Sequence, residues 1–143
     1  MVDPGRVRSL LDRLGEEVAR LRLLSERAAD ELLEDPDLLA AVKYRFVVAI
    51  ETCVDVGQHV IASEGLRAPR DFADVFAVLG EGGFVPEDQV ARLQDMARFR
   101  NLLVHGYQRV DDRRVVEILA GRLSDFDAFR TSVAKAALEH RDP

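Results

Sequence analysis

The sequence predicts an all-α protein, a single domain over residues 1–143 folded as an antiparallel bundle of five to six helices. Apolar residues recur at steps of three and four along most of the chain, and no segment shows the alternation of a strand. Glycines and prolines fall between these periodic segments, as expected for turns that join helices. With 143 residues, 48% of them apolar and 32% charged, the chain is long enough for a hydrophobic core.

The first two helices are predicted from their apolar faces and their end signals. One helix is expected from Arg6 to about Glu34. Asp35 and Pro36 predict the N-cap and first residue of a second helix, which continues to about Glu64 and stops at Gly65. Because apolar residues cover much of its circumference, this second helix is expected at the centre of the bundle. The first helix has its apolar residues at Val7, Leu10, Leu11, Leu14, Val18, Leu21 and Leu24.

A polar stripe interrupts the apolar surface of the second helix. Glu51, Asp55 and Gln58 share one face by their spacing, and such a stripe must meet solvent, a partner or a site. Glu51 and Asp55 are therefore candidate acceptors for a cationic site residue. His59 is more simply a structural hydrogen-bonding group. Asp55 and His59 alone are too few ligands for a metal site, so no metal is predicted.

Four further helical segments follow. A short helix is expected from Asp71 to Leu79, ended by Gly80, and Pro86 opens the next helix. Another turn or two should cover 113–120. Ser124 and Asp127 resemble a capping box that would begin the last helix, and residues 140–143 should fray. The last helix has its apolar face at Phe126, Phe129, Val133 and Ala137.

Cysteine content and the N-terminal sequence predict a cytoplasmic protein. The single cysteine, Cys53, excludes an internal disulfide framework and stands among apolar residues that favour burial. The opening residues Met-Val-Asp-Pro-Gly lack the apolar core of a signal peptide, and no uninterrupted apolar run approaches the roughly 18–20 residues of a membrane span.

The net charge of −6 excludes a generally basic nucleic-acid-binding coat. Between residues 98 and 114, however, five arginines face two aspartates, which gives a local charge of +3. The sequence therefore predicts a local anion site on an acidic body. The five arginines are Arg98, Arg100, Arg109, Arg113 and Arg114.

The stretch Arg100–Tyr107, with sequence RNLLVHGY, concentrates the chemistry. Arg100 offers a planar, always-charged fork for phosphate oxygens, and histidine is the side chain suited to proton transfer near neutral pH. In an unbroken helix Arg100 and His105 would point about 140° apart. Gly106 can end a helix at positive φ, so His105 and Tyr107 are expected to turn back toward Arg100, in a cleft lined by the polar stripe.

This stretch resembles the Arg-x4-His-x-Tyr motif of the HEPN superfamily, in the form found in HepT toxins. Residues 55–62, 65–69, 71–72 and 76–79 resemble the second and third helices of that family in order and spacing, and 111–126 resemble its segment after the motif. The resemblance covers nearly the whole chain and implies a HEPN-type antiparallel helical bundle.

The resemblance also implies an activity. The chain is expected to be a metal-independent, cofactor-free endoribonuclease toxin, acting on RNA as a homodimer whose two motifs line one cleft. Arg100 and His105 would be catalytic, and Asn101 would orient His105, bind a phosphate oxygen or cap the helix. The implied partner is an MntA-type nucleotidyltransferase antitoxin that transfers AMP to Tyr107. The alternative is a non-catalytic module of the same fold that binds a nucleotide or a nucleotidyltransferase.

Overall fold

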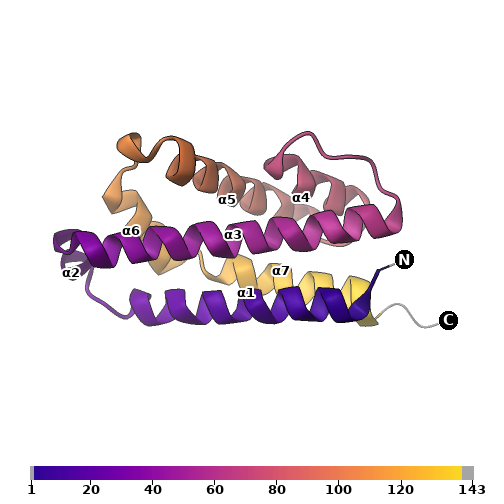
Figure 1. Ribbon diagram of the computed structural model, residues 1–143, viewed down its shortest axis with the longest axis horizontal. Helices are drawn as coiled ribbons and strands as arrows, with labels where there is room; N and C mark the ends of the chain where they lie inside the picture. Colours follow the sequence, from indigo (N-terminus) through magenta and orange to yellow (C-terminus); the bar gives the residue numbers. More distant parts are fainter. Residues whose placement is uncertain (1, 140–143) are drawn as a thin grey trace.

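The computed structural model describes residues 2–139, and within this range it contains seven α-helices, two short helical turns and no strand (Figure 1). The all-α prediction is confirmed, but the expected five to six helices are seven. The elements are α1 Pro4–Ser25, α2 Ala29–Glu34, α3 Pro36–Glu64, α4 Phe72–Glu81, α5 Glu87–His105, the 3-10 turn η1 Tyr107–Arg109, α6 Asp112–Gly121, α7 Ser124–Ala134 and the π-helical turn η2 Lys135–Glu139.

Helix α3 is the centre of the bundle, as predicted. It packs on α1 along one side and on α4 and α5 along the other, while α7 lies beside α1 (Figure 1). Its twelve buried positions include Phe46, whose ring packs edge-on against Phe99 of α5 with centroids 5.3 Å apart. Phe126 of α7 stands 6.4 Å from the same ring. These contacts fix α5 against α3 next to Arg100.

The ends of α3 follow from local chemistry, as predicted. The Asp35 side chain accepts hydrogen bonds from the backbone N–H groups of Asp37 and Leu38, both at 3.1 Å, and Pro36 follows it as the first helical residue. Gly65 closes the helix with φ of 64°, in the left-handed region that glycine adopts without steric cost.

The expected single helix over residues 6–34 is wrong, because the chain breaks after Ser25. The Ser25 hydroxyl donates to the carbonyl of Arg22 at 2.6 Å. The next two N–H groups bond three residues back, to Leu23 and Leu24, which tightens the last turn and ends α1. The short α2 that follows buries Leu32.

Two end signals were also misassigned. Gly80 lies inside α4, which continues to Glu81; a Cβ at Gly80 would stand only 2.7 Å from Val90, so this glycine permits the approach of α4 to α5. Ser124 does not cap α7: Leu123 is the N-cap and makes no side-chain capping bond. Asp127 instead forms an ion pair with Arg22, which links α7 to α1.

Helix α3 is long and apolar enough to cross a membrane by length and composition, although 56% of its most apolar window is buried inside the fold. It therefore has the character of a core helix. Cys53 is buried within it, as predicted. The expected fraying of residues 140–143 lies outside the described residues.

Candidate active site

The motif occupies the C-terminal end of α5 and the turn that follows it (Figure 1). Helix α5 ends at His105, where the sequence placed its end, but Gly106 has φ of −127° and not the expected positive value. Its N–H still bonds to the carbonyl of Leu102 at 2.9 Å, and its carbonyl accepts from Arg109 at 2.8 Å. A Cβ at Gly106 would stand 3.0 Å from the Leu102 side chain, so the position favours glycine for space.

Arg100 is held by the polar stripe of α3. Its Nε and Nη2 donate to the same carboxylate oxygen of Glu51, at 2.8 and 2.5 Å. Its Nη1 donates to the side-chain oxygen of Asn101 at 3.2 Å, and its guanidinium lies 4.8 Å from the ring centre of Phe72 in a cation–π contact. With its side chain only 16% exposed, Arg100 has a fixed orientation in this chain.

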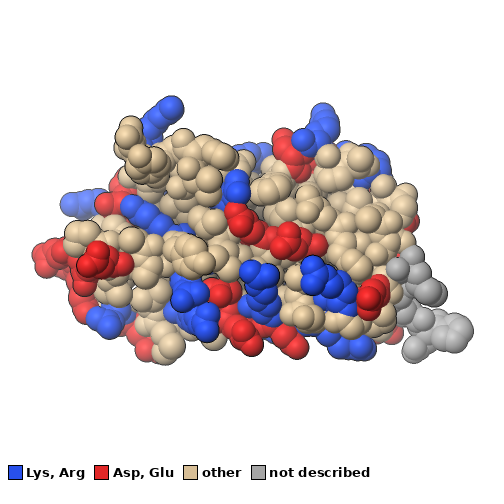
Figure 2. Space-filling model, viewed as in Figure 1, with Lys and Arg blue, Asp and Glu red and all other residues tan. Residues whose placement is uncertain are grey.

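Asp55 stands one helical turn beyond Glu51 and is exposed. Among the described residues it makes no ion pair with Arg100, and Gln58 on the same stripe is also exposed. The structure thus brings Glu51, and not Asp55, to Arg100. Figure 2 shows acidic side chains over the middle of α3, the stretch to which both carboxylates belong.

His105 and Tyr107 are both exposed, Tyr107 to 67%. Because α5 continues without a break through His105, the side chains of Arg100 and His105 leave the helix about 140° apart. The expectation that His105 turns back toward the Arg100 face is therefore wrong. Asn101 is exposed and lies one turn before His105 on the same helix.

Apolar surface surrounds the motif. Val104 is 39% exposed, one turn after Arg100, and Tyr44 of α3 is 61% exposed. Helices α3 and α5 run antiparallel here, since Glu51 pairs with Arg100 while Lys43 pairs with Asp112 at 2.8 Å, beyond the end of α5. Val104 and Tyr107 therefore lie toward the end of α3 that carries Tyr44. Figure 2 shows few charged side chains over this end of α5.

The local positive charge is only partly neutralised. Arg98 pairs with Asp95 and Arg114 with Glu117, each at 3.2 Å on the surface, and Arg100 pairs with Glu51. Arg109 and Arg113 are exposed and make no side-chain ion pair among the described residues. Cationic groups therefore remain available beside the motif.

Two further side chains, Phe72 and His59, make contacts that the sequence predicted only in part or not at all. No pattern in the sequence indicated that the ring of Phe72, which packs against the core, would also lie against Arg100. His59 accepts a hydrogen bond at 3.3 Å from the backbone N–H of Asp3 and lies 3.5 Å from the Ser63 hydroxyl, which is the structural role considered for it. Within residues 2–139 no group of three histidine, cysteine, aspartate or glutamate side chains is placed to hold a metal ion.

The family model described as ribonuclease HepT-like matches residues 14–133, which include the whole motif and most of the bundle. The chain belongs to the HepT-like family. A curated relative, the mRNA nuclease HepT of Shewanella oneidensis, is 29% identical over 79 residues, which are 55% of this chain and 59% of that protein. The matched part thus spans about three-fifths of that HepT-like relative.

Solved structures share the fold of this HepT-like chain. The tri-AMPylated HEPN toxin of Shewanella oneidensis, solved in complex with the MNT antitoxin, superposes with a TM-score of 0.83 at 22% identity, covering 93% of this chain and 98% of that one. YutE, a cytosolic protein of unknown function from Bacillus subtilis, gives a TM-score of 0.80 at 18% identity, covering 96% and 94%. At these identities the likeness shows the HEPN fold alone.

Proposed function

We propose that this HepT-like protein is a toxin that cleaves RNA, with Arg100 and His105 as its catalytic residues and a cleft formed by two copies of the chain. The observation that carries the proposal is the motif at the end of α5 in a chain of this family, with His105 exposed and Arg100 already oriented by Glu51. The related mRNA nuclease HepT supports the same class of activity.

The chemistry requires three groups. The 2′-hydroxyl of RNA attacks the adjacent phosphorus while a base takes its proton, and an acid protonates the departing 5′-oxygen. Positive charge must stabilise the crowded phosphate in between. His105 has the side-chain type for the base or the acid, and Arg100 for the phosphate. Imidazole and guanidinium groups supply all three functions, so the proposed mechanism needs no metal.

One chain offers a single His105, directed away from Arg100. A two-fold dimer brings two imidazoles and two guanidiniums to one place, which provides both a base and an acid. The apolar surface formed by Tyr44, Val104 and Tyr107 supports an interface beside the motif, since exposed apolar clusters mark association surfaces. Asn101, next to His105 on the helix, is proposed to orient it or to bind a phosphate oxygen.

Tyr107 is the proposed site of control. A nucleotidyltransferase antitoxin would transfer AMP to its hydroxyl, and the added bulk and negative charge would exclude RNA. The 67% exposure of Tyr107 supports access by such an enzyme, and AMPylation is known for the related Shewanella toxin. Asp55, exposed on the α3 stripe, is proposed to line the same cleft.

The decisive experiment expresses the wild type beside His105→Ala and Arg100→Ala, and scores growth and RNA integrity. The proposal expects growth arrest and RNA cleavage from the wild type alone, with purified wild type remaining active in EDTA. Arg13→Ala, an exposed arginine on α1, is the matched control and should keep full activity. Equal RNA integrity in wild type and His105→Ala would refute the nuclease.

The second candidate function is a non-catalytic HEPN module that binds a nucleotide or a nucleotidyltransferase. The tight Arg100–Glu51 pair favours it, because this guanidinium is already occupied by a carboxylate in the isolated chain. In that case the wild type would cleave no more RNA than His105→Ala or Arg100→Ala, but it would still bind its partner.

A further inference from the structure

A groove between α5 and α6 combines arginines with apolar side chains. It encloses about 360 Å³. Arg98 and Leu102 line it from α5, Arg114 lines it from α6, and Arg122 lines it from the position that caps the end of α6. Leu102 is 40% exposed although it is apolar, so the groove presents exposed apolar surface beside its arginines.

The groove lies on the same side of α5 as His105. Arg98, Leu102 and His105 are spaced by four and three residues and therefore lie on one stripe of α5. Arg114 stands in the first turn of α6 and Arg122 just after its last residue, and both line the groove. The cationic walls thus lead along α5 for about 10 Å toward the exposed imidazole, at 1.5 Å per residue.

The charge in the groove is available to a ligand. Arg98 and Arg114 have side chains 63% and 58% exposed, and among the described residues each forms its ion pair with a surface acid three residues away on its own helix. Such surface pairs contribute little and are readily exchanged. Arg122 is engaged by Asp125, so the charge that the groove offers to a ligand comes from Arg98 and Arg114, on a body with net charge −6.

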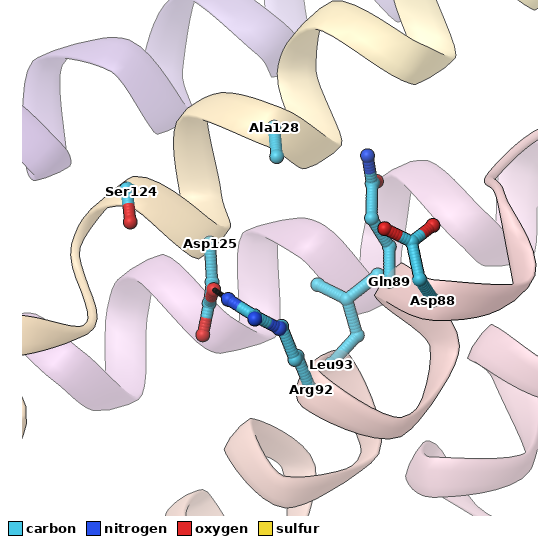
Figure 3. Close-up of a pocket in the computed structure, with 7 residues that line it drawn as sticks. All are labelled: Asp88, Gln89, Arg92, Leu93, Ser124, Asp125 and Ala128. Carbon is cyan, nitrogen blue, oxygen red and sulfur yellow. Dashed lines mark hydrogen bonds and ion pairs between the residues drawn. The ribbon is translucent and has the colours of Figure 1, made fainter.

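The far end of the groove is built rigidly. Asp125 is 5% exposed and holds two guanidiniums: Arg122 donates to it at 2.7 Å and Arg92 at 3.4 Å. Figure 3 shows Arg92 reaching across from α5 to Asp125 of α7, beside a second cavity of about 270 Å³. These ion pairs hold Arg122 in place.

We infer that the α5–α6 groove binds the RNA strand and leads it to His105, an inference that rests on the proposed nuclease function. Arg98 and Arg114 contact phosphates, while the apolar floor and the flat guanidiniums pack against unstacked bases, as proteins do with single-stranded RNA. An acidic protein surface would also complement the positive charge of the groove, but it would not explain why the groove is aligned with His105.

The test replaces the two exposed arginines and leaves Arg122, because Arg122 neutralises the buried Asp125. RNA binding is measured with a fluorescein-labelled single-stranded RNA of about 20 nucleotides of mixed sequence, in a His105→Ala background that prevents cleavage. Adding Arg98→Gln and Arg114→Gln should weaken binding about 10- to 30-fold at 0.1 M salt and lower the salt slope by about 1.4, the value for two phosphate contacts on a single strand. In otherwise wild-type protein the same pair should raise KM and leave kcat unchanged.

The matched control is Arg13→Gln with Arg27→Gln, which removes the same charge from exposed positions of α1 and the turn after it. Arg27 also pairs with an exposed acid, Glu31, one turn away. Arg98→Lys with Arg114→Lys should restore the salt slope, because lysine keeps the phosphate-binding charge, but only part of the affinity, because lysine has no flat guanidinium to pack on a base.

The outcomes separate the groove from the activity. If the Arg98→Gln/Arg114→Gln variant binds and cleaves RNA like the control variant while His105→Ala abolishes cleavage, the groove inference is overturned and the nuclease proposal stands. If the Arg98→Gln/Arg114→Gln variant loses binding only to a nucleotidyltransferase partner and not to RNA, the groove is a protein-binding surface and the inference is equally overturned. If wild type neither binds nor cleaves RNA, both fail.

Discussion

The pair formed by Arg100 and Glu51 should show strong energetic coupling in a double-mutant cycle. Two N–H groups of Arg100 donate to one Glu51 oxygen, and Arg100 is largely buried. Hydrogen bonds to charged groups contribute about 1.5–3 kcal/mol, but Glu51 is 40% exposed and water competes for it. We therefore expect a coupling free energy of about 1–2 kcal/mol from Glu51→Ala, Arg100→Ala and the double variant.

The assay is urea unfolding followed by circular dichroism, with Arg27 and Glu31 as the reference pair. That pair is i,i+4 on the surface, with side chains 52% and 48% exposed, and should couple by about 0.3–0.5 kcal/mol. Glu51→Ala alone should lower Tm by roughly 3–7 °C in a chain of this size. A coupling no larger than that of the reference pair would show that Glu51 does not hold Arg100 in solution.

Three further predictions concern stability and reactivity. Gly57→Ala should cost about 1–3 kcal/mol in urea unfolding, because its Cβ would stand 2.5 Å from Val75; a gain in stability would mean that α3 and α4 separate easily. Hydrogen bonds from Arg67 hold the pKa of Asp74 well below its usual range, so this carboxylate stabilises the fold above the unfolded pKa of about 4 and that contribution is lost as pH falls below it. Asp74→Asn should be less stable at pH 7 and flatten the acid branch of the stability profile, and an unchanged acid branch would contradict this. Burial raises the pKa of the Cys53 thiol, so iodoacetamide should label it in urea but not in the native protein, where labelling would indicate local opening.

Features set by neighbouring residues were predictable from the sequence. Asp35, Pro36 and Gly65 determine the ends of α3 through their own backbone and side-chain chemistry, so a local pattern was sufficient. Ser124 failed as a cap because the chain is already helical at Leu123, whose carbonyl accepts from the N–H of Phe126 at 3.1 Å, and because Asp127 is engaged by Arg22, which is 105 residues away in the sequence. Such long-range competition is not encoded in a four-residue pattern.

The same distinction applies to the site. The motif and the α3 stripe were found from residue types and helical spacing, and their meeting through Arg100 and Glu51 follows from α3 being central. The place of Phe72 against Arg100 depends on how α4 packs, and no spacing rule gives that. The prediction of a positive φ at Gly106 was wrong, because glycine permits positive φ without requiring it.

The separation of Arg100 and His105 by about 140° around α5 makes the proposed activity depend on a second chain. A heterodimer of wild type with an Arg100→Ala/His105→Ala chain keeps one complete motif but loses one imidazole and one guanidinium. If the two His105 side chains serve as base and acid, its cleavage rate should fall by about 10²–10⁴-fold, the contribution of one general acid or base. The measurement uses two affinity tags purified in tandem, with a wild-type/wild-type pair carrying the same tags as control. Half or more of the control rate would mean that one motif suffices, and then the shared cleft is wrong even if His105 is catalytic.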